Sequence, residues 1–298
     1  CLMLSILIPT YNYDCFSLVK ELKKQADTLQ FDYEILVQDD CSSLFIEENS
    51  KINLLDKCSF NINSSNLGRT NNRLTLVNKS SFELLLFLDS DVFPKDGNFL
   101  KKYISEFSKS KIDVVFGGIV YKEQKPEINE ILRWVYGKER ESLTVCKRLK
   151  KPYKTVFTSN LLIKKNIYRE LLFNTDLCNY GYEDFVISQE LKSKNILIHH
   201  IDNPVFHLNL ETSAIFLDKI QVSLQNLKII SLKKSNYKDD SQLLYVYNFV
   251  KKVHLTKFIN FIFNSFKIKM ENHLLSNNPK IIILDLYKLG YYCKINLE

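Results

Sequence analysis

Short apolar runs alternate with amphipathic stretches through the first two thirds of the chain. The apolar runs predict buried strands at 4–8, 33–37, 60–62, 83–88, 112–116, 156–163 and 196–200. The amphipathic stretches predict helices at 14–29, 69–80, 97–108 and 183–193. Continuous apolar strands that alternate with helices are typical of a mostly parallel sheet covered on both faces. The pattern therefore predicts an α/β fold of this kind.

The pattern changes at residue 211. Two further helices are predicted at 212–233 and 242–274, with a polar break between them. From Glu211 onward there are 13 Lys and 7 Asp or Glu, a net charge of +6, against +7 for the whole chain. We therefore expect an α/β domain at 1–210 and a Lys-rich helical extension at 211–298. Residues 121–154 show little periodicity and predict a long loop or a helical insertion.

Three interpretations of the Lys-rich extension stay open. Its many apolar positions favour a helical cap that completes the fold or forms a homodimer. Its charge, together with the aromatic run at 258–266, favours contact with an anionic membrane surface. Docking to another enzyme of a synthesis pathway is the third.

Composition narrows the class of protein. The 298 residues are 45% hydrophobic and 25% charged, a globular mixture that excludes a disordered chain. Seven scattered cysteines without a C-x-x-C pair favour reduced thiols in a cytoplasmic protein. The sequence contains no run of 18 apolar residues, the length that would predict a transmembrane helix. Any membrane contact is therefore expected to be peripheral, at the inner face of the membrane. The basic residues form no clustered stripe, so no nucleic-acid partner is expected.

Polar residues follow three of the predicted strands, and acidic residues follow two of them. The first strand leads into Thr10, Tyr11 and Asn12, the second into Asp39 and Asp40, and the fourth into Asp89, Ser90 and Asp91. In an open parallel sheet, ligands bind beyond the carboxyl ends of the strands. A cluster of carboxylates there is costly unless a cation neutralises it. A divalent metal is the simplest answer, with a phosphate or diphosphate as its partner.

Two common phosphate-binding motifs are missing from the sequence. Neither G-x-G-x-x-G nor G-x-x-x-x-G-K-[ST] follows the first strand, which disfavours a dinucleotide-binding fold and a P-loop NTPase. Phosphate charge must then be met by a metal and by arginine. Arg69 and Arg73, on the helix before the acidic strand, are placed to help.

Five segments together resemble family 2 glycosyltransferases. In order, they are Ser5-Ile-Leu-Ile-Pro-Thr-Tyr-Asn12, Asp39-Asp40, Asn66-Leu-Gly-Arg69, Leu86-Phe-Leu-Asp-Ser-Asp-Val-Phe-Pro94 and Gly181-Tyr-Glu-Asp184. The resemblance covers residues 3 to about 210. It implies the Rossmann-like GT-A fold and a metal-dependent transfer of sugar from a UDP-sugar to a glycan or lipid-linked glycan. The implied pathway is synthesis of a bacterial surface polysaccharide, such as capsule or O-antigen.

The resemblance also implies roles for individual residues. In the nucleotide-sugar site, Tyr11 would lie against the base, and Asp39 or Asp40 would contact the uracil imide. The other residues that would bind the nucleotide-sugar are Thr10, Asn12, Asn66, Arg69, Asp89, Ser90 and Asn160. Asp91, with Asp89, would bind Mn²⁺ or Mg²⁺, which stabilises the departing diphosphate. His207 would be a further ligand, a set that suits Mn²⁺ at least as well as Mg²⁺.

Catalysis in such an enzyme also needs a general base for the acceptor hydroxyl. The resemblance assigns this role to Asp184, with Glu183 beside it binding the acceptor. A base opposite the departing diphosphate implies single displacement and inversion at the anomeric carbon. The usual D-D-G-S turn is Asp39-Asp40-Cys41-Ser42 here, and the Q-x-x-R-W motif of processive enzymes is missing near Asp184.

Structural explanations compete with these roles. Asp89 and Asp91 could cap a helix, Glu183 and Asp184 could merely complement a helix dipole, and His207 could be a hydrogen-bonded strand-end residue. Two other functions compete as well: a phosphatase with Asp89 as nucleophile, and a catalytically silent module that binds sugar-nucleotides or glycans. The phosphatase is disfavoured because its nucleophile would follow the first strand. The silent module stays open.

Overall fold

The computed structural model describes residues 3–109, 112–172, 181–233 and 241–297. The chain divides into two compact units. We call them the sheet unit, with described residues 3–121, 141–172 and 184–209, and the helical unit, with 122–140, 181–183, 210–233 and 241–297.

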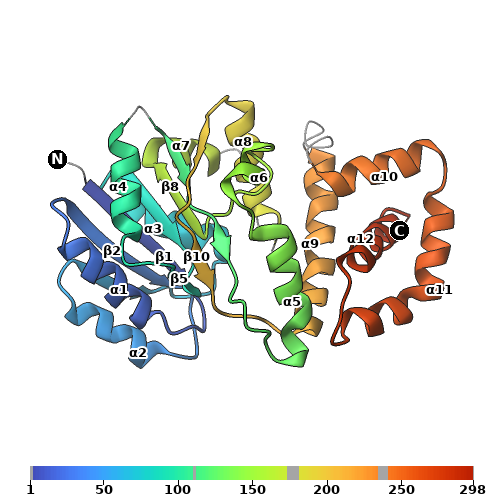
Figure 1. Cartoon of the computed structure of the whole chain (residues 1–298), viewed down its shortest axis with the longest axis horizontal. Helices are drawn as coiled ribbons and strands as arrows, with labels where there is room; N and C mark the ends of the chain where they lie inside the picture. Colours follow the sequence, from blue (N-terminus) through green and yellow to red (C-terminus); the bar gives the residue numbers. More distant parts are fainter. Residues whose placement is uncertain (1–2, 110–111, 173–180, 234–240, 298) are drawn as a thin grey trace. The chain divides into compact units, whose positions relative to one another are not determined.

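The sheet unit contains a seven-stranded sheet (Figure 1). Its strand order is β3-β2-β1-β4-β8-β6-β9. All neighbours are parallel except β8, which runs antiparallel to β4 and β6. The strands are β1 (Met3–Thr10), β2 (Asp32–Asp39), β3 (Cys58–Ile62), β4 (Leu84–Leu88), β6 (Val114–Phe116), β8 (Asn160–Lys164) and β9 (Ile198–His200). The predicted mostly parallel α/β sheet is confirmed.

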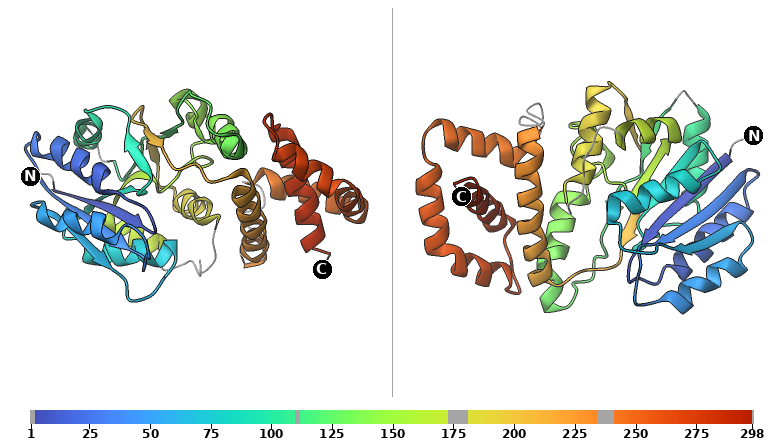
Figure 2. Two further views of the ribbon diagram at one scale, coloured as in Figure 1. Left: turned by 90° about the horizontal axis from the view of Figure 1, so that it is seen from below. Right: turned by 180° about the vertical axis from the view of Figure 1, so that it is seen from behind.

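The central strands are buried on both faces, which explains their continuous apolar runs. Every residue of β4 is buried, and Ile6, Leu7 and Ile8 of β1 have no exposed surface. One face is covered by α3 (Arg69–Lys79), α7 (Lys165–Leu172) and α8 (Glu183–Ser193), which share a core with the sheet. On the other face α1 (Phe16–Asp27) and α4 (Phe99–Lys109) pack together (Figure 2). A short α2 (Ile46–Ser50) and a 3₁₀ turn at Lys51–Leu54 follow β2.

A second, three-stranded sheet lies in the same unit. It consists of β5 (Val92–Pro94), β10 (Val205–His207) and β7 (Ile119–Val120). In the antiparallel pair of β10 and β5, His207 is opposite Val92. This pairing brings His207 next to Asp91 although 116 positions separate them in the sequence. Another short helix of the unit, α6 (Val145–Leu149), lies within the region predicted as a loop or insertion.

The helical unit contains α5 (Ile131–Tyr136), α9 (Ser213–Lys233), α10 (Gln242–Lys252), α11 (Thr256–Leu274) and α12 (Ile281–Ile295). A 3₁₀ turn at Ile128–Glu130 precedes α5, and a π turn at Gly137–Glu141 follows it. The single helix predicted at 242–274 is two helices, because the chain turns at His254, whose φ is 58°.

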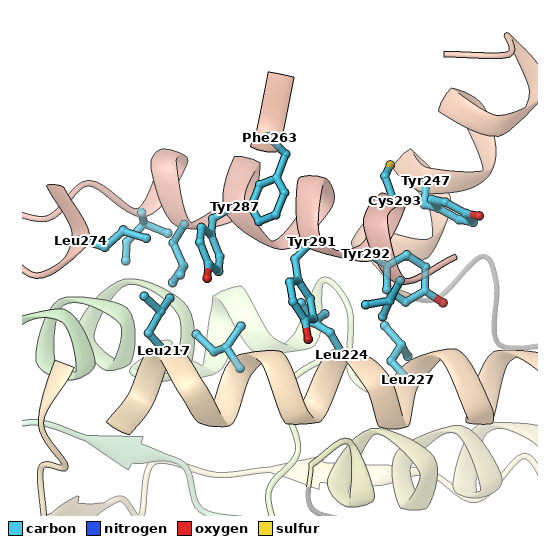
Figure 3. Close-up of a cluster of buried hydrophobic side chains, with 14 of the residues drawn as sticks. Leu217, Leu224, Leu227, Tyr247, Phe263, Leu274, Tyr287, Tyr291, Tyr292 and Cys293 are labelled. Atoms are coloured by element: carbon cyan, nitrogen blue, oxygen red, sulfur yellow. The ribbon is translucent and has the colours of Figure 1, made fainter. Parts of the chain in front are cut away.

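Tyrosines of α12 form the centre of the helical unit's core. Tyr287, Tyr291 and Tyr292 point toward α9 and pack with its leucines (Figure 3). Two of the hydroxyls accept hydrogen bonds from α9, Tyr287 from Gln221 at 2.8 Å and Tyr291 from Gln225 at 3.0 Å. The Tyr287 hydroxyl also donates to Glu271 at 2.7 Å, so both buried hydroxyl groups have hydrogen-bond partners.

Two expectations about the chain as a whole can be compared with the described residues. Within them, no helix is both long and apolar enough to cross a bilayer. The five cysteines whose state is described, Cys15, Cys41, Cys58, Cys146 and Cys293, carry free thiols.

Candidate active site

The carboxyl ends of β1, β2 and β4 meet at one edge of the large sheet. Thr10 pairs with Asp39 across β1 and β2, and β4 lies on the other side of β1. Parallel pairing therefore brings together the strand-end residues that the sequence singled out.

The two carboxylates that follow β2 are buried and hydrogen-bonded within the protein. Asp39 accepts from the backbone N–H and the hydroxyl of Ser42, at 2.7 and 2.5 Å. Asp40 accepts from the side-chain amide of Asn63 at 2.9 Å. It also accepts from the N–H groups of Leu67 and Gly68, at 2.8 and 2.9 Å. Asp40 thus orients the loop that leads into α3, and its contact with a base stays a prediction.

The segment after β1 is similarly fixed, apart from one aromatic ring. The side-chain oxygen of Asn12 accepts from the N–H groups of Ser43 and Leu44, at 2.9 and 3.1 Å. Thr10 is buried and donates to the carbonyl of Tyr13. Tyr11, by contrast, is 55% exposed. Among these three residues, Tyr11 has the surface needed to stack on a nucleotide base.

Asp89 lies in an ion-pair cluster with two arginines of α3. Arg73 donates to Oδ1 at 2.5 Å and Arg69 to Oδ2 at 3.0 Å. Burial opposes the charge of Asp89, but Arg73 and Arg69 outweigh it and hold the pKa of Asp89 below its usual value. The Arg73 side chain is itself buried, whereas Arg69 is half-exposed. Asp89 therefore stays ionised, with both oxygens bound by protein donors.

Asp91 faces His207. Its Oδ2 lies 3.7 Å from His207 Nε2, too far for a hydrogen bond. The distance is shorter than twice the usual metal–ligand length of about 2.1 Å, so both atoms can reach one ion. The imidazole ring stacks on Tyr121, with 5.5 Å between ring centroids. A carboxylate with an imidazole fits Mn²⁺ or Mg²⁺ if diphosphate and water complete the set. Within the described residues no group of three or more His, Cys, Asp or Glu is suited to a metal.

Asp184 is held by Thr158. Its Oδ1 accepts from the backbone N–H of Thr158 at 2.9 Å and from the hydroxyl at 2.7 Å. Thr158 is buried, so this arrangement fixes the carboxylate at the start of α8. Glu183, the first residue of α8, is also buried.

Asn160 does not reach the surface. It is fully buried, accepts from the Tyr103 hydroxyl at 2.7 Å, and donates to the carbonyls of Gly118 and Asn203 at 2.8 and 2.9 Å. It therefore joins the segments that lead into β7 and β10. These bonds help to position β10, and the contact of Asn160 with a donor sugar stays a prediction.

The two remaining residues of the predicted set lie in loops. Asn66 is exposed, and its side-chain oxygen accepts from the N–H of Gly68 at 3.2 Å. Ser90 is half-buried between Asp89 and Asp91.

Three residues of the candidate site could not be assigned from the sequence. Thr158 supports Asp184 from 26 positions away, and Tyr121 supports His207 from 86 positions away. Neither belongs to a motif, so only the fold reveals them. A third, Tyr13, lies near Asp91: burial, and then the charge of Asp91, raise the pKa of Tyr13.

Comparison with known proteins agrees with this architecture. One solved structure similar to this chain is "Mannosyltransferase PcManGT from Pyrobaculum calidifontis in complex with GDP-Man and Mn2+". Its TM-score is 0.53 at 13% identity, over 76% of this chain and 64% of that one, just under two thirds. Another is S. aureus TarS 1–349, with a TM-score of 0.51 at 15% identity, over 100% of this chain and 92% of that one.

TarS 1–349 in complex with UDP-GlcNAc gives a TM-score of 0.50 at 14% identity, over 100% of this chain and 93% of that one. At such identities the likeness shows the GT-A fold alone. No curated protein matches the sequence significantly.

The family model described as "Glycosyl transferase family 2" matches residues 5–172, more than half of the chain. That range includes both strand-end acidic segments and the cluster of Arg69, Arg73 and Asp89. The chain therefore belongs to glycosyl transferase family 2 and is a glycosyltransferase with the GT-A fold.

Proposed function

We propose that this glycosyltransferase moves a sugar from a UDP-sugar to a hydroxyl of a glycan or lipid-linked glycan, with inversion at the anomeric carbon. The pathway would be synthesis of a bacterial capsule or O-antigen polysaccharide. The observation that carries the proposal is that two carboxylates of the sheet unit lie in different surroundings, which suit them to different roles. Asp91 faces an imidazole, whereas Asp184 is held separately by a threonine.

Asp91 and His207 would hold a divalent cation. Bound Mn²⁺ or Mg²⁺ would supply Lewis-acid stabilisation of the diphosphate as it leaves. The Mn²⁺ present in the Pyrobaculum mannosyltransferase structure supports a metal in this fold. Asp89, already neutralised by Arg69 and Arg73, is better suited to accept a hydrogen bond from the ribose than to be a primary ligand.

The nucleotide would be bound at the β1–β2 side of the site. The exposed ring of Tyr11 would stack on the base, and Asp40, with Asp39 as the alternative, would recognise the uracil imide. Thr10, Asn12 and Asn66 would shape this pocket mainly through the loops that they hold. The UDP-GlcNAc bound to TarS supports a uridine nucleotide.

Asp184 would remove the proton from the acceptor hydroxyl, and Glu183 would bind the acceptor. The acceptor oxygen then forms a bond to the anomeric carbon as the bond to the diphosphate breaks and UDP leaves. The two hydrogen bonds from Thr158 fix the orientation of the Asp184 carboxylate.

Two variants separate the roles of the carboxylates. Asp184→Asn should abolish transfer and leave UDP affinity unchanged, since its effect is on the acceptor side. Asp91→Asn should weaken both metal and UDP binding. Asp113→Asn, at the opposite end of β6 in an exposed ion pair, is the matched control. If transfer survives in Asp184→Asn, Asp184 is not the base; if the unaltered protein has no activity, the silent binding module is favoured.

A further inference from the structure

The helical unit leaves a set of large apolar side chains in contact with solvent. Phe258, Phe261 and Ile268 of α11 are 57, 69 and 72% exposed. The core of the unit takes other residues of the same helix, chiefly Phe263 and Leu274, which are 1 and 0% exposed. Packing in the core therefore accounts for the apolar residues on one side of α11, but it does not account for these three exposed side chains.

The exposed residues form a single stripe along α11. Phe261 and Ile268 follow Phe258 by three and ten positions, spacings that return to the same side of a helix. Lys257 and Lys269 are also exposed and project from the two margins of this stripe. We call these five residues the α11 face.

The preceding helix, α10, also combines exposed aromatic side chains with exposed lysines. Tyr245 and Phe249 of α10 are 64 and 61% exposed and lie one turn apart. Lys251 and Lys252, both exposed, end that helix, and α11 begins four residues later (Figure 1). Between residues 242 and 274 there are five Lys and one Glu, a net charge of +4.

The charge decides what can cover this surface. In a two-fold dimer the same patch meets itself, so two surfaces with the same net positive charge would be brought together. An anionic bilayer instead attracts the lysines while the phenylalanine rings enter the region between headgroups and acyl chains. An acidic protein would neutralise the lysines, but it would also need an apolar surface shaped to receive the phenylalanine rings. A helical stripe of apolar residues with lysines at its margins is instead typical of interfacial helices.

We infer that the α11 face, aided by the exposed row on α10, docks the protein on the surface of a bilayer that contains anionic phospholipid. The contact is peripheral, since no described helix is suited to spanning. This inference is independent of the proposed sugar transfer. Its residues all belong to the helical unit, and failure of either proposal leaves the other standing.

The test is sedimentation of the full chain with liposomes of phosphatidylcholine alone, or with about 30% phosphatidylglycerol. Binding is expected only to the anionic vesicles and should weaken at least about tenfold between 50 and roughly 500 mM NaCl. No binding to anionic vesicles, or equal binding to both kinds, overturns the inference.

Variants locate the contact. Phe258→Ser/Phe261→Ser/Ile268→Ser and Lys257→Glu/Lys269→Glu should each reduce vesicle binding at least about tenfold. Matched controls in the sheet unit are Leu54→Ser/Leu149→Ser/Leu197→Ser, which are 84, 55 and 71% exposed, and Lys101→Glu/Lys147→Glu. Unchanged binding by the α11 variants overturns the inference. So does a dimer in sedimentation equilibrium that the triple serine variant dissociates, because a second copy would then cover the face.

Discussion

The arrangement of the site depends on which oppositely charged partner each charged side chain has. Arg73 is buried and donates to Asp89, which is also largely buried, whereas the second partner, Arg69, is half-exposed. A buried ion pair is weak evidence of stability as a whole, but removal of one partner leaves an uncompensated charge. Arg73 is therefore expected to be essential for the acidic edge to fold as it does.

The Arg73→Met substitution should lower the free energy of unfolding by about 3 kcal/mol, because Arg69 compensates Asp89 only in part. Chemical denaturation at pH 7 measures the loss. Lys102→Met, which breaks an exposed ion pair with Asp96, is the matched control and should cost less than about 1 kcal/mol. A loss from Arg73→Met no larger than that of the control contradicts this account of Asp89.

A second residue-scale prediction concerns pH. Burial, with a contribution from nearby Arg148, lowers the pKa of His200 to about 4, although a hydrogen bond with the Pro152 carbonyl opposes the shift. The unfolded chain takes up this proton near pH 6.5. The stabilisation is therefore complete above about 6.5 and is lost as the pH falls toward 4.

His200 should contribute about 2 kcal/mol to the fall in stability between pH 7 and 4, less than the full shift implies because the ring is not wholly shielded. Urea denaturation across this range measures the fall. His200→Gln should reduce the slope, and His199→Gln, a half-buried neighbour, should leave it unchanged. Equal slopes in the unaltered protein and His200→Gln rule out this role.

At the scale of elements, strong local patterns were predicted well. The helix predicted at 183–193 is α8 with the same bounds, and β1, β2 and β4 lie where apolar runs placed them. The strand predicted at 156–163 begins only at Asn160, because the apolar residues before it pack without pairing. The strands β5 and β7 were not predicted, because they are too short to show a periodic pattern. Helix α12 was not predicted either, because it is buried on most sides and its sequence therefore lacks an amphipathic pattern.

The packing of α11 on α12 depends on Gly290. A methyl group added there would lie 2.5 Å from the ring of Phe263. Overpacking of this kind costs about 1–3 kcal/mol, and the gain in helix propensity of about 1 kcal/mol offsets only part of it. Gly290→Ala should therefore lower the free energy of unfolding by up to about 2 kcal/mol.

Thermal and urea denaturation measure this effect. Gly97→Ala is the matched control, because a methyl group there meets nothing within 4 Å. Stabilisation by Gly290→Ala would contradict close packing of α11 on α12.

At the scale of the molecule, sequence reasoning identified the family, and it singled out strand-end residues that the structure brings to one edge of the sheet. Asp89, Asp91 and Asp184 are motif residues, so they could be chosen from the sequence. Their partners could not, because Thr158 and Tyr121 lie far from the motifs and reach them only through the fold. The helical unit also takes residues 122–140 from the middle of the chain, which the expected boundary at 210 did not include.

The central claim is that the acidic edge binds a uridine diphosphate together with a divalent cation. The most direct measurement is the thermal stability of the full chain with UDP, GDP, CMP or ADP, each with Mn²⁺ or with EDTA. We expect a rise in Tm of several degrees with UDP and Mn²⁺ alone, since a ligand at about 100 times its Kd adds roughly 2.7 kcal/mol. The rise should disappear in Asp91→Asn. A rise that persists in EDTA, or no rise with any nucleotide, would contradict the account.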